Sequence, residues 1–316
     1  MSTPNNTDLV VIGGGPAGVS AALTAASLGM RTILVEAERI GSKLYAIGSL
    51  ENLAGGWTNG PQLAKALTAD VERLEATGAC EVVHGRAVSV GIQEHEAQVS
   101  LDDERLLRAS AVVVATGVAS LGPGDVEWLV APDLATPEQL WRTKPAALDG
   151  HGKIVVLGAD RPLGTWLRAH PDADVSLHVL HPESDRYKTE EVARDPRVYL
   201  EETKHARLVP IPGGIRVTSE RAEGGFHTFA ADVVLMNAGS RPSALPGLTT
   251  GTDGYCPADA QHRRILIAGD LKGSRMQRIA IAMGDGQRCA LTPYYERALP
   301  TAARVADSPS QGSVQV

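Results

Sequence analysis

The sequence predicts an α/β protein with two Rossmann-like, three-layer domains, the second inserted into the first. A strand, a glycine-rich turn, a helix and a second strand follow one another in residues 8–36, and the same order returns in weaker form in residues 153–180. Two nearly all-apolar strands close these units, and they end in glycine within residues 111–117 and 232–239. Strands that alternate with helices in this way are typical of parallel sheets covered by helices.

The first turn has the spacing of an adenine dinucleotide site. Leu9 to Ile12 is an apolar, mostly β-branched run, and Gly13, Gly15 and Gly18 follow it. In such a turn the first glycine permits a tight bend, the second lets the backbone approach a pyrophosphate, and the third allows close helix–strand packing. Glu36 ends the next strand, where an acid accepts both hydroxyls of a ribose.

The helix after this turn fits the same interpretation. Pro16 suits a first helical turn, where its missing N–H group is no loss. Phosphates would lie on the free N–H groups at the positive end of this helix. The alternative is a glycine-rich turn that serves only the packing of strand and helix.

The composition limits the class of protein. A chain of 316 residues favours roughly two domains, and a hydrophobic content of 43% supplies a core. No apolar run is long enough to span a membrane, and the N-terminus lacks the features of a signal peptide. A net charge of −7 argues against nucleic acid or an anionic membrane as a partner. Cys80, Cys256 and Cys289 lie far apart, which fits a cytoplasmic protein.

No metal site is expected. The three cysteines have no C-x-x-C spacing. The histidines, His178 and His227 among them, show no ligand spacing either.

The remaining chain contains further elements. Residues 37–61 form an irregular segment with five glycines, and loops of this length are usually functional. Apolar spacing and turn residues predict, in chain order, a helix at 62–77, a strand at 82–90, a hairpin of 97–101 with 105–108, a crossover at 119–151, a helix at 165–169, short strands up to 231, a strand at 264–269, and a helical segment at 275–299 with a glycine turn at 284–286.

Four segments carry a resemblance to a known family. They are GGGPAG at 13–18 with Glu36, LENLAGG at 50–56, Ala-Thr-Gly at 115–117, and Ile-Ala-Gly-Asp at 267–270. On these segments the chain resembles the low-molecular-weight thioredoxin reductases, within the pyridine nucleotide–disulfide oxidoreductase superfamily. The resemblance extends over nearly the whole chain, up to about residue 299.

The resemblance implies FAD as the cofactor. Asn52 maps onto the asparagine beside the isoalloxazine ring, and Asp270 onto the aspartate that binds the ribityl chain. The helical segment from Arg275 resembles the one whose positive end faces the flavin pyrimidine, where it stabilises the negative charge of the reduced ring. The expected FAD-binding residues are Gly13, Gly15, Pro16, Ala17, Gly18, Glu36, Asn52, Val88, Ala115, Thr116, Gly117, Gly269, Asp270, Arg278 and Ile279.

The resemblance also implies a domain plan and an assembly. Residues 1–118 and 245–299 would form the FAD-binding domain. Residues 119–244 would form a degenerate NAD(P)-binding-like domain, and residues 300–316 a disordered tail. A homodimer is expected by analogy, with the loop around Trp57 as a plausible interface.

The redox-active cysteines of the family are missing. Its C-x-x-C falls at Trp141-Arg142-Thr143-Lys144, where no residue carries sulfur. No dithiol–disulfide exchange with a thioredoxin can occur there. Trp141 and Lys144 are instead candidates for groups near the flavin, the first by stacking and the second by holding an anion. Their alternative roles are a packing tryptophan and a surface lysine.

The second nucleotide turn departs from the pattern as well. Gly158 keeps the first glycine, but Asp160 and Leu163 hold the second and third positions. A carboxylate adds bulk and like charge where backbone must approach a pyrophosphate. The family binds the 2′-phosphate of NADPH through His-Arg-Arg, and this chain has His181-Pro182-Glu183 there. Arg186 could compensate.

These departures predict a changed electron path. The first hypothesis is an FAD-dependent oxidoreductase, not a disulfide reductase, with a donor other than NADPH: ferredoxin, reduced flavin or a small organic substrate. The second is a non-catalytic FAD-binding redox sensor or scaffold. The third keeps disulfide chemistry through Cys256 or Cys289, against the simpler interpretation of Cys289 as a small buried hydrophobe.

Overall fold

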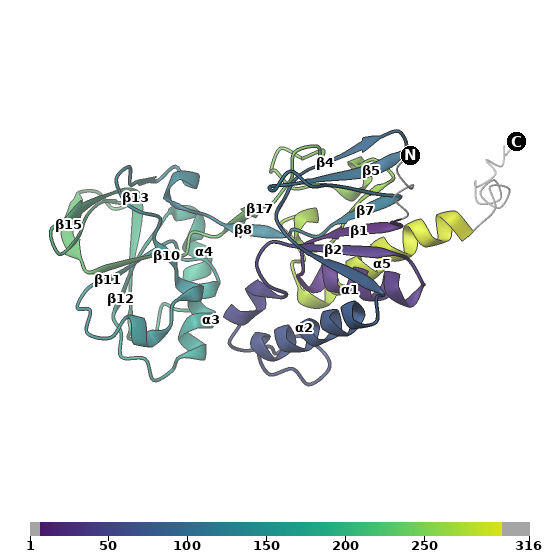
Figure 1. Ribbon diagram of the computed structural model, residues 1–316. Coiled ribbons are helices and arrows are strands. Elements are labelled where there is room, and N and C mark those ends of the chain that lie inside the picture. Colours follow the sequence, from purple (N-terminus) through teal and green to yellow (C-terminus); the bar gives the residue numbers. More distant parts are fainter. Residues whose placement is uncertain (1–6, 299–316) are drawn as a thin grey trace, which may run out of the picture. The chain divides into compact units, whose positions relative to one another are not determined.

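The computed structural model describes residues 7–298, in two compact units (Figure 1). The first unit comprises residues up to 42, 66–117 and those from 244 onward, and the second comprises 43–65 and 118–243. The structure thus groups residues 43–65 with the second unit, whereas the sequence places them in the FAD-binding domain. The predicted tail, 300–316, lies outside the described residues.

The first unit is built on a five-stranded parallel sheet with the strand order β18-β7-β1-β2-β3. Its strands are β1 (Leu9–Ile12), β2 (Thr32–Glu36), β3 (Cys80–His84), β7 (Ala111–Val114) and β18 (Ile265–Ile267). The helices are α1 (Pro16–Ser27), α5 (Ile279–Ala298) and the part of α2 (Gly60–Ala76) that falls in this unit. An antiparallel sheet of β4 (Ala87–Gln93), β5 (Glu96–Leu101) and β6 (Leu106–Ala109) completes it.

Both faces of this parallel sheet are covered. Val10 and Ile12 of β1 belong to a cluster shared with Val90 of β4 and Val99 of β5. The alternate residues Leu9 and Val11 are equally buried, as expected for a strand of a parallel sheet with both faces packed. On the helical side α1 packs against α5 (Figure 1).

The second unit contains an eight-stranded mixed sheet with the order β10-β16-β11-β12-β13-β14-β15, and β9 pairs with β13. Its strands are β9 (Leu129–Val130), β10 (Glu138–Gln139), β11 (Ile154–Leu157), β12 (Leu177–His181), β13 (Val198–Ile211), β14 (Gly214–Arg221), β15 (Phe226–Ala231) and β16 (Val233–Met236). Its helices are α3 (Pro162–Ala169) and α4 (Arg186–Thr189), and β8 (Val118–Ser120) pairs with β17 (Ser240–Pro242). Ile154 and Val156 pack in one core and Val155 and Leu157 in another.

The predicted α/β class with Rossmann-like parallel sheets is confirmed, but two element predictions are wrong. Residues 82–90 are not one strand: β3 ends at His84, and β4 enters a different sheet from Ala87. The predicted glycine turn at 284–286 is also absent, because α5 runs through it. A Cβ atom on Gly286 would lie 1.9 Å from the carbonyl oxygen of Ala17, so this glycine serves close helix packing.

Candidate functional site

The carboxyl ends of four neighbouring strands in the first unit lie level with one another. Ile12 of β1 pairs with Val35 of β2 and with Val114 of β7, and Ile267 of β18 also pairs with Val114. The predicted residues at 13–18, 36, 115–117 and 269–270 therefore lie at or just after the ends of these strands, at one edge of the sheet. Ligands of open α/β sheets bind at this edge, where the strand order reverses, and here it reverses between β1 and β7.

The glycine turn after β1 has one position that backbone packing leaves open. A Cβ atom on Gly13 would lie 2.6 Å from the carbonyl oxygen of Ala115, and one on Gly18 would lie 1.8 Å from that of Gly13. Backbone packing therefore requires glycine at both. A Cβ atom on Gly15, by contrast, would meet no atom within 4 Å. This open space at the first turn of α1, beside Pro16, fits a phosphate group.

The Glu36 carboxylate is fixed beside this turn. The amide of Gly14 donates to its Oε2 atom at 2.5 Å, and the amide of Glu38 donates to its Oε1 atom at 2.7 Å. A carboxylate accepts about four hydrogen bonds, so it keeps capacity for the hydroxyls of a ribose. The amide of Gly85 donates to the Glu36 carbonyl. Val88 lies at a β-bulge three residues later and is 40% exposed.

The end of β18 is brought to the same turn. A Cβ atom on Gly269 would lie 3.0 Å from the Cβ atom of Ala17. Asp270 follows and is half-buried. The side-chain amide of Gln277 donates to the Asp270 carbonyl at 3.4 Å, just before α5 begins. Arg278 is exposed and Ile279 half-buried at the start of α5. The structure therefore groups 13–18, 115–117 and 269–270 at one edge.

The corresponding turn of the second unit begins in the same way. The Gly158 amide donates to the Leu180 carbonyl, as the Gly13 amide donates to the Val35 carbonyl. A Cβ atom on Gly158 would lie 2.5 Å from the Cα atom of Ala238. Register from these glycines makes Asp160 the counterpart of Gly15.

Ion pairs fill this second turn. The Asp160 carboxylate lies 3.0 Å from Nζ of Lys188, which is also 2.8 Å from the Asp185 carboxylate. Asp185 accepts from the Ala159 amide at 3.2 Å, as Glu36 accepts from the Gly14 amide. Burial alone would lower the pKa of Lys188, but its two carboxylate partners raise it, so Lys188 stays charged. Leu163, at the third glycine position, is 1% exposed in the core.

The comparisons with known proteins agree with this geometry. Residues 7–159 match the family described as pyridine nucleotide-disulphide oxidoreductase. Thioredoxin reductase from Lactococcus lactis superposes with a TM-score of 0.74 at 18% identity, covering 92% of this chain and 98% of that one. The chain has the thioredoxin reductase fold. Thioredoxin reductase from T. acidophilum superposes with a TM-score of 0.71 at 19% identity, covering 93% and 100%.

Curated relatives are longer than this chain. The F subunit of alkyl hydroperoxide reductase from Staphylococcus aureus (strain MSSA476) is 24% identical over 308 residues, which cover 91% of this chain and 58% of that protein. The same protein of Pseudomonas aeruginosa is 26% identical over 323 residues, covering 91% and 57%. The family match covers just under half of this chain, and the solved structures show its fold. The family match and the structural neighbours agree with the expected FAD cofactor.

Three predicted site residues belong to the second unit. Asn52 is exposed in the irregular segment, and Lys144 is exposed as well. Trp141 is half-buried: its Nε1 atom donates to Oγ of Ser120 at 3.2 Å, and the guanidinium of Arg142 lies 4.6 Å from its ring centre. The roles of Asn52, Trp141 and Lys144 toward the flavin stay predictions.

The cysteines are all buried and free. Burial raises the pKa of Cys80 and of Cys289 to about 11, and it raises the pKa of Cys256. Because the thiolate is the reactive form, this environment disfavours disulfide chemistry.

The sequence gives no sign of one cluster in the second unit. His178, Glu201 and His227 meet side by side, although 23 and 26 residues separate them. These spacings match no ligand motif, and strand register alone brings the residues together.

No helix within residues 7–298 is long and apolar enough to cross a membrane.

Proposed function

We propose that this chain is an FAD-dependent oxidoreductase of thioredoxin reductase-like fold that takes electrons from a donor other than NADPH and does not reduce disulfides. The donor would be a ferredoxin-type protein, a reduced flavin or a small organic substrate. One contrast carries the proposal. The first nucleotide turn leaves open space at Gly15, whereas Asp160, its counterpart in the second unit, is held in ion pairs with Lys188.

The first turn supplies what an FAD molecule needs from the protein. The free N–H groups at the start of α1 would hold the pyrophosphate. Glu36, oriented by the Gly14 and Glu38 amides, would accept the ribose hydroxyls. Asp270 would hold the ribityl chain, and the N-terminal end of α5 would favour negative charge on the flavin pyrimidine. Bound FAD supplies electron exchange, singly or in pairs.

The second turn opposes a nicotinamide dinucleotide on two grounds. A pyrophosphate approaching the backbone there would meet the carboxylate of Asp160, and the two negative charges would repel each other. Moving that carboxylate aside would also separate it from Lys188, to which it is bound in a largely buried place. The Asn237 side-chain amide further clamps the turn, since it donates to the carbonyls of Gly158 and Asp160.

Disulfide reduction is disfavoured on separate grounds. No cysteine stands within Trp141–Lys144, and Cys80, Cys256 and Cys289 are buried thiols with raised pKa values. Flavin reactivity is intrinsic to the cofactor, so an oxidoreductase needs no cysteine to exchange electrons with another donor.

An anaerobic stopped-flow survey of reductants tests the proposal. We expect the flavin absorbance to persist after mixing with NADPH or NADH and to bleach with dithionite, which proves that the flavin is reducible. Bleaching by reduced ferredoxin, reduced free flavin or an organic substrate, with turnover, would identify the donor class. Rapid bleaching by NADPH would refute the proposal, as would purified protein that does not take up FAD.

A second candidate is a non-catalytic FAD-binding redox sensor or scaffold. The loss of the family's catalytic groups favours it, since no cysteine stands within Trp141–Lys144. Failure of every donor class to give turnover, together with a change in proteolysis pattern on chemical reduction, would support this candidate. The homodimer and the cytoplasmic location stay predictions, and sedimentation of the full chain tests the former.

A further inference from the structure

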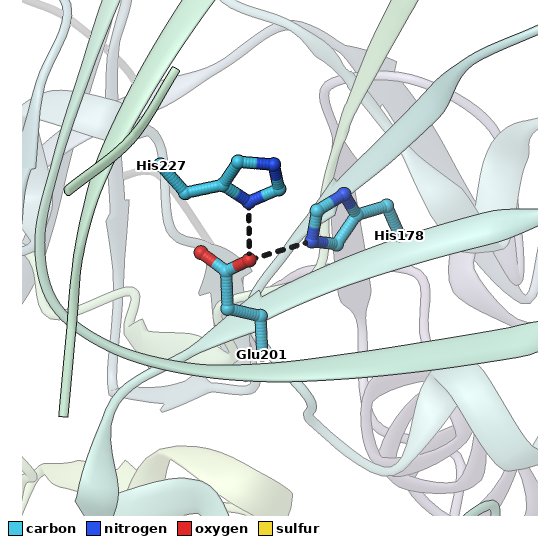
Figure 2. A group of neighbouring side chains, drawn as sticks. All are labelled: His178, Glu201 and His227. Carbon is cyan, nitrogen blue, oxygen red and sulfur yellow. Dashed lines mark hydrogen bonds and ion pairs between the residues drawn. The ribbon is translucent and has the colours of Figure 1, made fainter. Parts of the chain in front are cut away.

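Three side chains from three strands of the second unit point at one another (Figure 2). His178 lies on β12, Glu201 on β13 and His227 on β15. The Oε2 atom of Glu201 lies 3.1 Å from Nε2 of His178 and 2.8 Å from Nδ1 of His227. The three candidate ligand atoms all lie within 4.8 Å of one another. Zinc bonds of ~2.0–2.1 Å place tetrahedral ligands about 3.3 Å apart, so the cluster needs only a small adjustment to surround an ion.

The cluster is buried and held by its sheet. His178 is 5% exposed and Glu201 4%. The strands are hydrogen-bonded neighbours, in the order β12-β13-β14-β15. Ser219 of β14 pairs directly with His227 of β15. Because no loop contributes a ligand, the arrangement is formed before any ion arrives.

Neighbouring groups orient the three side chains as outer-shell groups do in metal sites. The hydroxyl of Ser219 donates to Oε1 of Glu201, which leaves Oε2 for the two imidazoles. Phe229 stacks on His178, with ring centres 4.8 Å apart and planes 18° apart. These contacts fix both the carboxylate and the first imidazole.

The guanidinium of Arg221 lies beside Oε2 of Glu201 but does not form a well-aligned ion pair with it. The Nε atom of Arg221 lies 3.6 Å from this oxygen, is buried and makes no hydrogen bond. Its Nη2 atom lies 3.1 Å from Nδ1 of His227. The Arg221 side chain is 33% exposed, so it can turn outward to solvent. A smaller cation would then satisfy all three ligands.

We propose that His178, Glu201 and His227 form a binding site for a divalent transition-metal ion, with zinc as the best match. Two imidazole nitrogens and one carboxylate oxygen are the donor set of three-ligand zinc sites. Calcium and magnesium prefer all-oxygen sites. The site belongs to the second unit, so it does not depend on the FAD proposal.

The access route fits this assignment. Glu201, Arg221 and Tyr199 also line a cavity of about 880 Å³. This cavity reaches Glu201 and Arg221 and is not lined by His178 or His227, so an ion would enter from it once Arg221 turns outward.

Competition titration of zinc tests the site. Untagged full-length protein, stripped with EDTA, is titrated with zinc against a chromogenic chelator. We expect one equivalent per chain in the wild type and at least ~100-fold weaker binding by H178Q, E201Q and H227Q, and ~10–100-fold weaker binding by S219A. H205Q is the matched control, because His205 is an exposed histidine on the same strand as Glu201. Its affinity should equal that of the wild type.

A second readout does not depend on the variants' folding. X-ray absorption at the zinc edge of the wild-type protein should show nitrogen and oxygen neighbours with the outer-shell pattern of imidazole. Of the ligand variants, H227Q is expected to disturb folding least, since the side chain of His227 is 30% exposed. Circular dichroism checks that this variant is folded. The proposal is overturned if the wild type binds no stoichiometric zinc, or if folded H227Q binds it as tightly as H205Q.

Discussion

The Nζ atom of Lys188 lies 3.0 Å from Oδ1 of Asp160, the residue that stands where the first nucleotide turn has Gly15. The same ammonium also pairs with the Asp185 carboxylate. Asp185 accepts a hydrogen bond from the Ala159 amide, just as Glu36 accepts one from the Gly14 amide in the first turn. The second turn therefore keeps the backbone geometry of the first turn and holds internal ion pairs where the first turn has open space. The two units therefore differ chemically within the first four residues of each turn, where one has Gly15 and the other has the charged Asp160.

Asp160→Gly alone should not give rapid flavin reduction by NADPH. Lys188 remains paired with Asp185, and Leu163 still holds the place of the third glycine. Since Lys188 keeps Asp185 as a partner and is not left as an unpaired buried charge, we expect a stability loss below the ~3–5 kcal/mol of a fully broken buried pair. The measurement is anaerobic stopped-flow absorbance, with Asp172→Gly at an exposed turn of the same unit as control. Fast bleaching in Asp160→Gly, absent in the control, would show that this one carboxylate was the whole barrier.

Gly15→Ala and Gly18→Ala should separate cofactor binding from folding. A methyl group at Gly15 meets no atom, so we expect the apo-protein to lose less than ~1 kcal/mol while FAD affinity falls at least tenfold, or ~1.4 kcal/mol. A methyl group at Gly18 lies 1.8 Å from the Gly13 carbonyl oxygen, so overpacking should cost at least ~1–3 kcal/mol of stability. Thermal unfolding of apo-protein and FAD titration measure the two effects. Equal FAD affinity in Gly15→Ala and wild type would show that the pyrophosphate does not bind at this turn.

Glu36→Ala should lower FAD retention. A hydrogen bond to a charged group contributes ~1.5–3 kcal/mol, so loss of the ribose contacts should weaken FAD binding by about tenfold or more. The measurement is the ratio of flavin to protein absorbance after gel filtration. Glu38→Ala is the control, because Glu38 reaches Glu36 through a backbone amide that the substitution keeps. Full cofactor content in Glu36→Ala would show that the ribose lies elsewhere.

The native thiols should react slowly with a disulfide reagent. With a pKa of about 11, the thiols of Cys80 and Cys289 are only about 0.1% thiolate at pH 8. We expect little reaction in the folded protein and reaction of all three cysteines in denaturant. Rapid titration of two native thiols, lost after oxidation, would instead support disulfide chemistry through Cys256 or Cys289.

The first nucleotide turn could be predicted because its determinants are local. Gly13, Gly15 and Gly18 stand within six residues, and the bend, the helix start and the packing all follow from neighbouring residues. Glu36 follows from the length of one helix and one strand. Two losses can also be recognised from residue identity alone. The C-x-x-C motif is missing, and Asp160 and Leu163 replace the second and third glycines of the turn that begins at Gly158.

Contacts between distant strands decided the rest. Gly286 lies in a continuous helix, not a turn, because the backbone of Ala17 packs against it. Lys188 meets Asp160 only because α4 follows β12 in the folded unit. His178, Glu201 and His227 meet through the register of four strands, which no local spacing encodes. The sequence by itself determined the fold class and the glycine turn between β1 and α1, since both depend on short-range chain geometry. Only the tertiary structure decided what fills the second turn and where the histidines converge, since both depend on which strands pair.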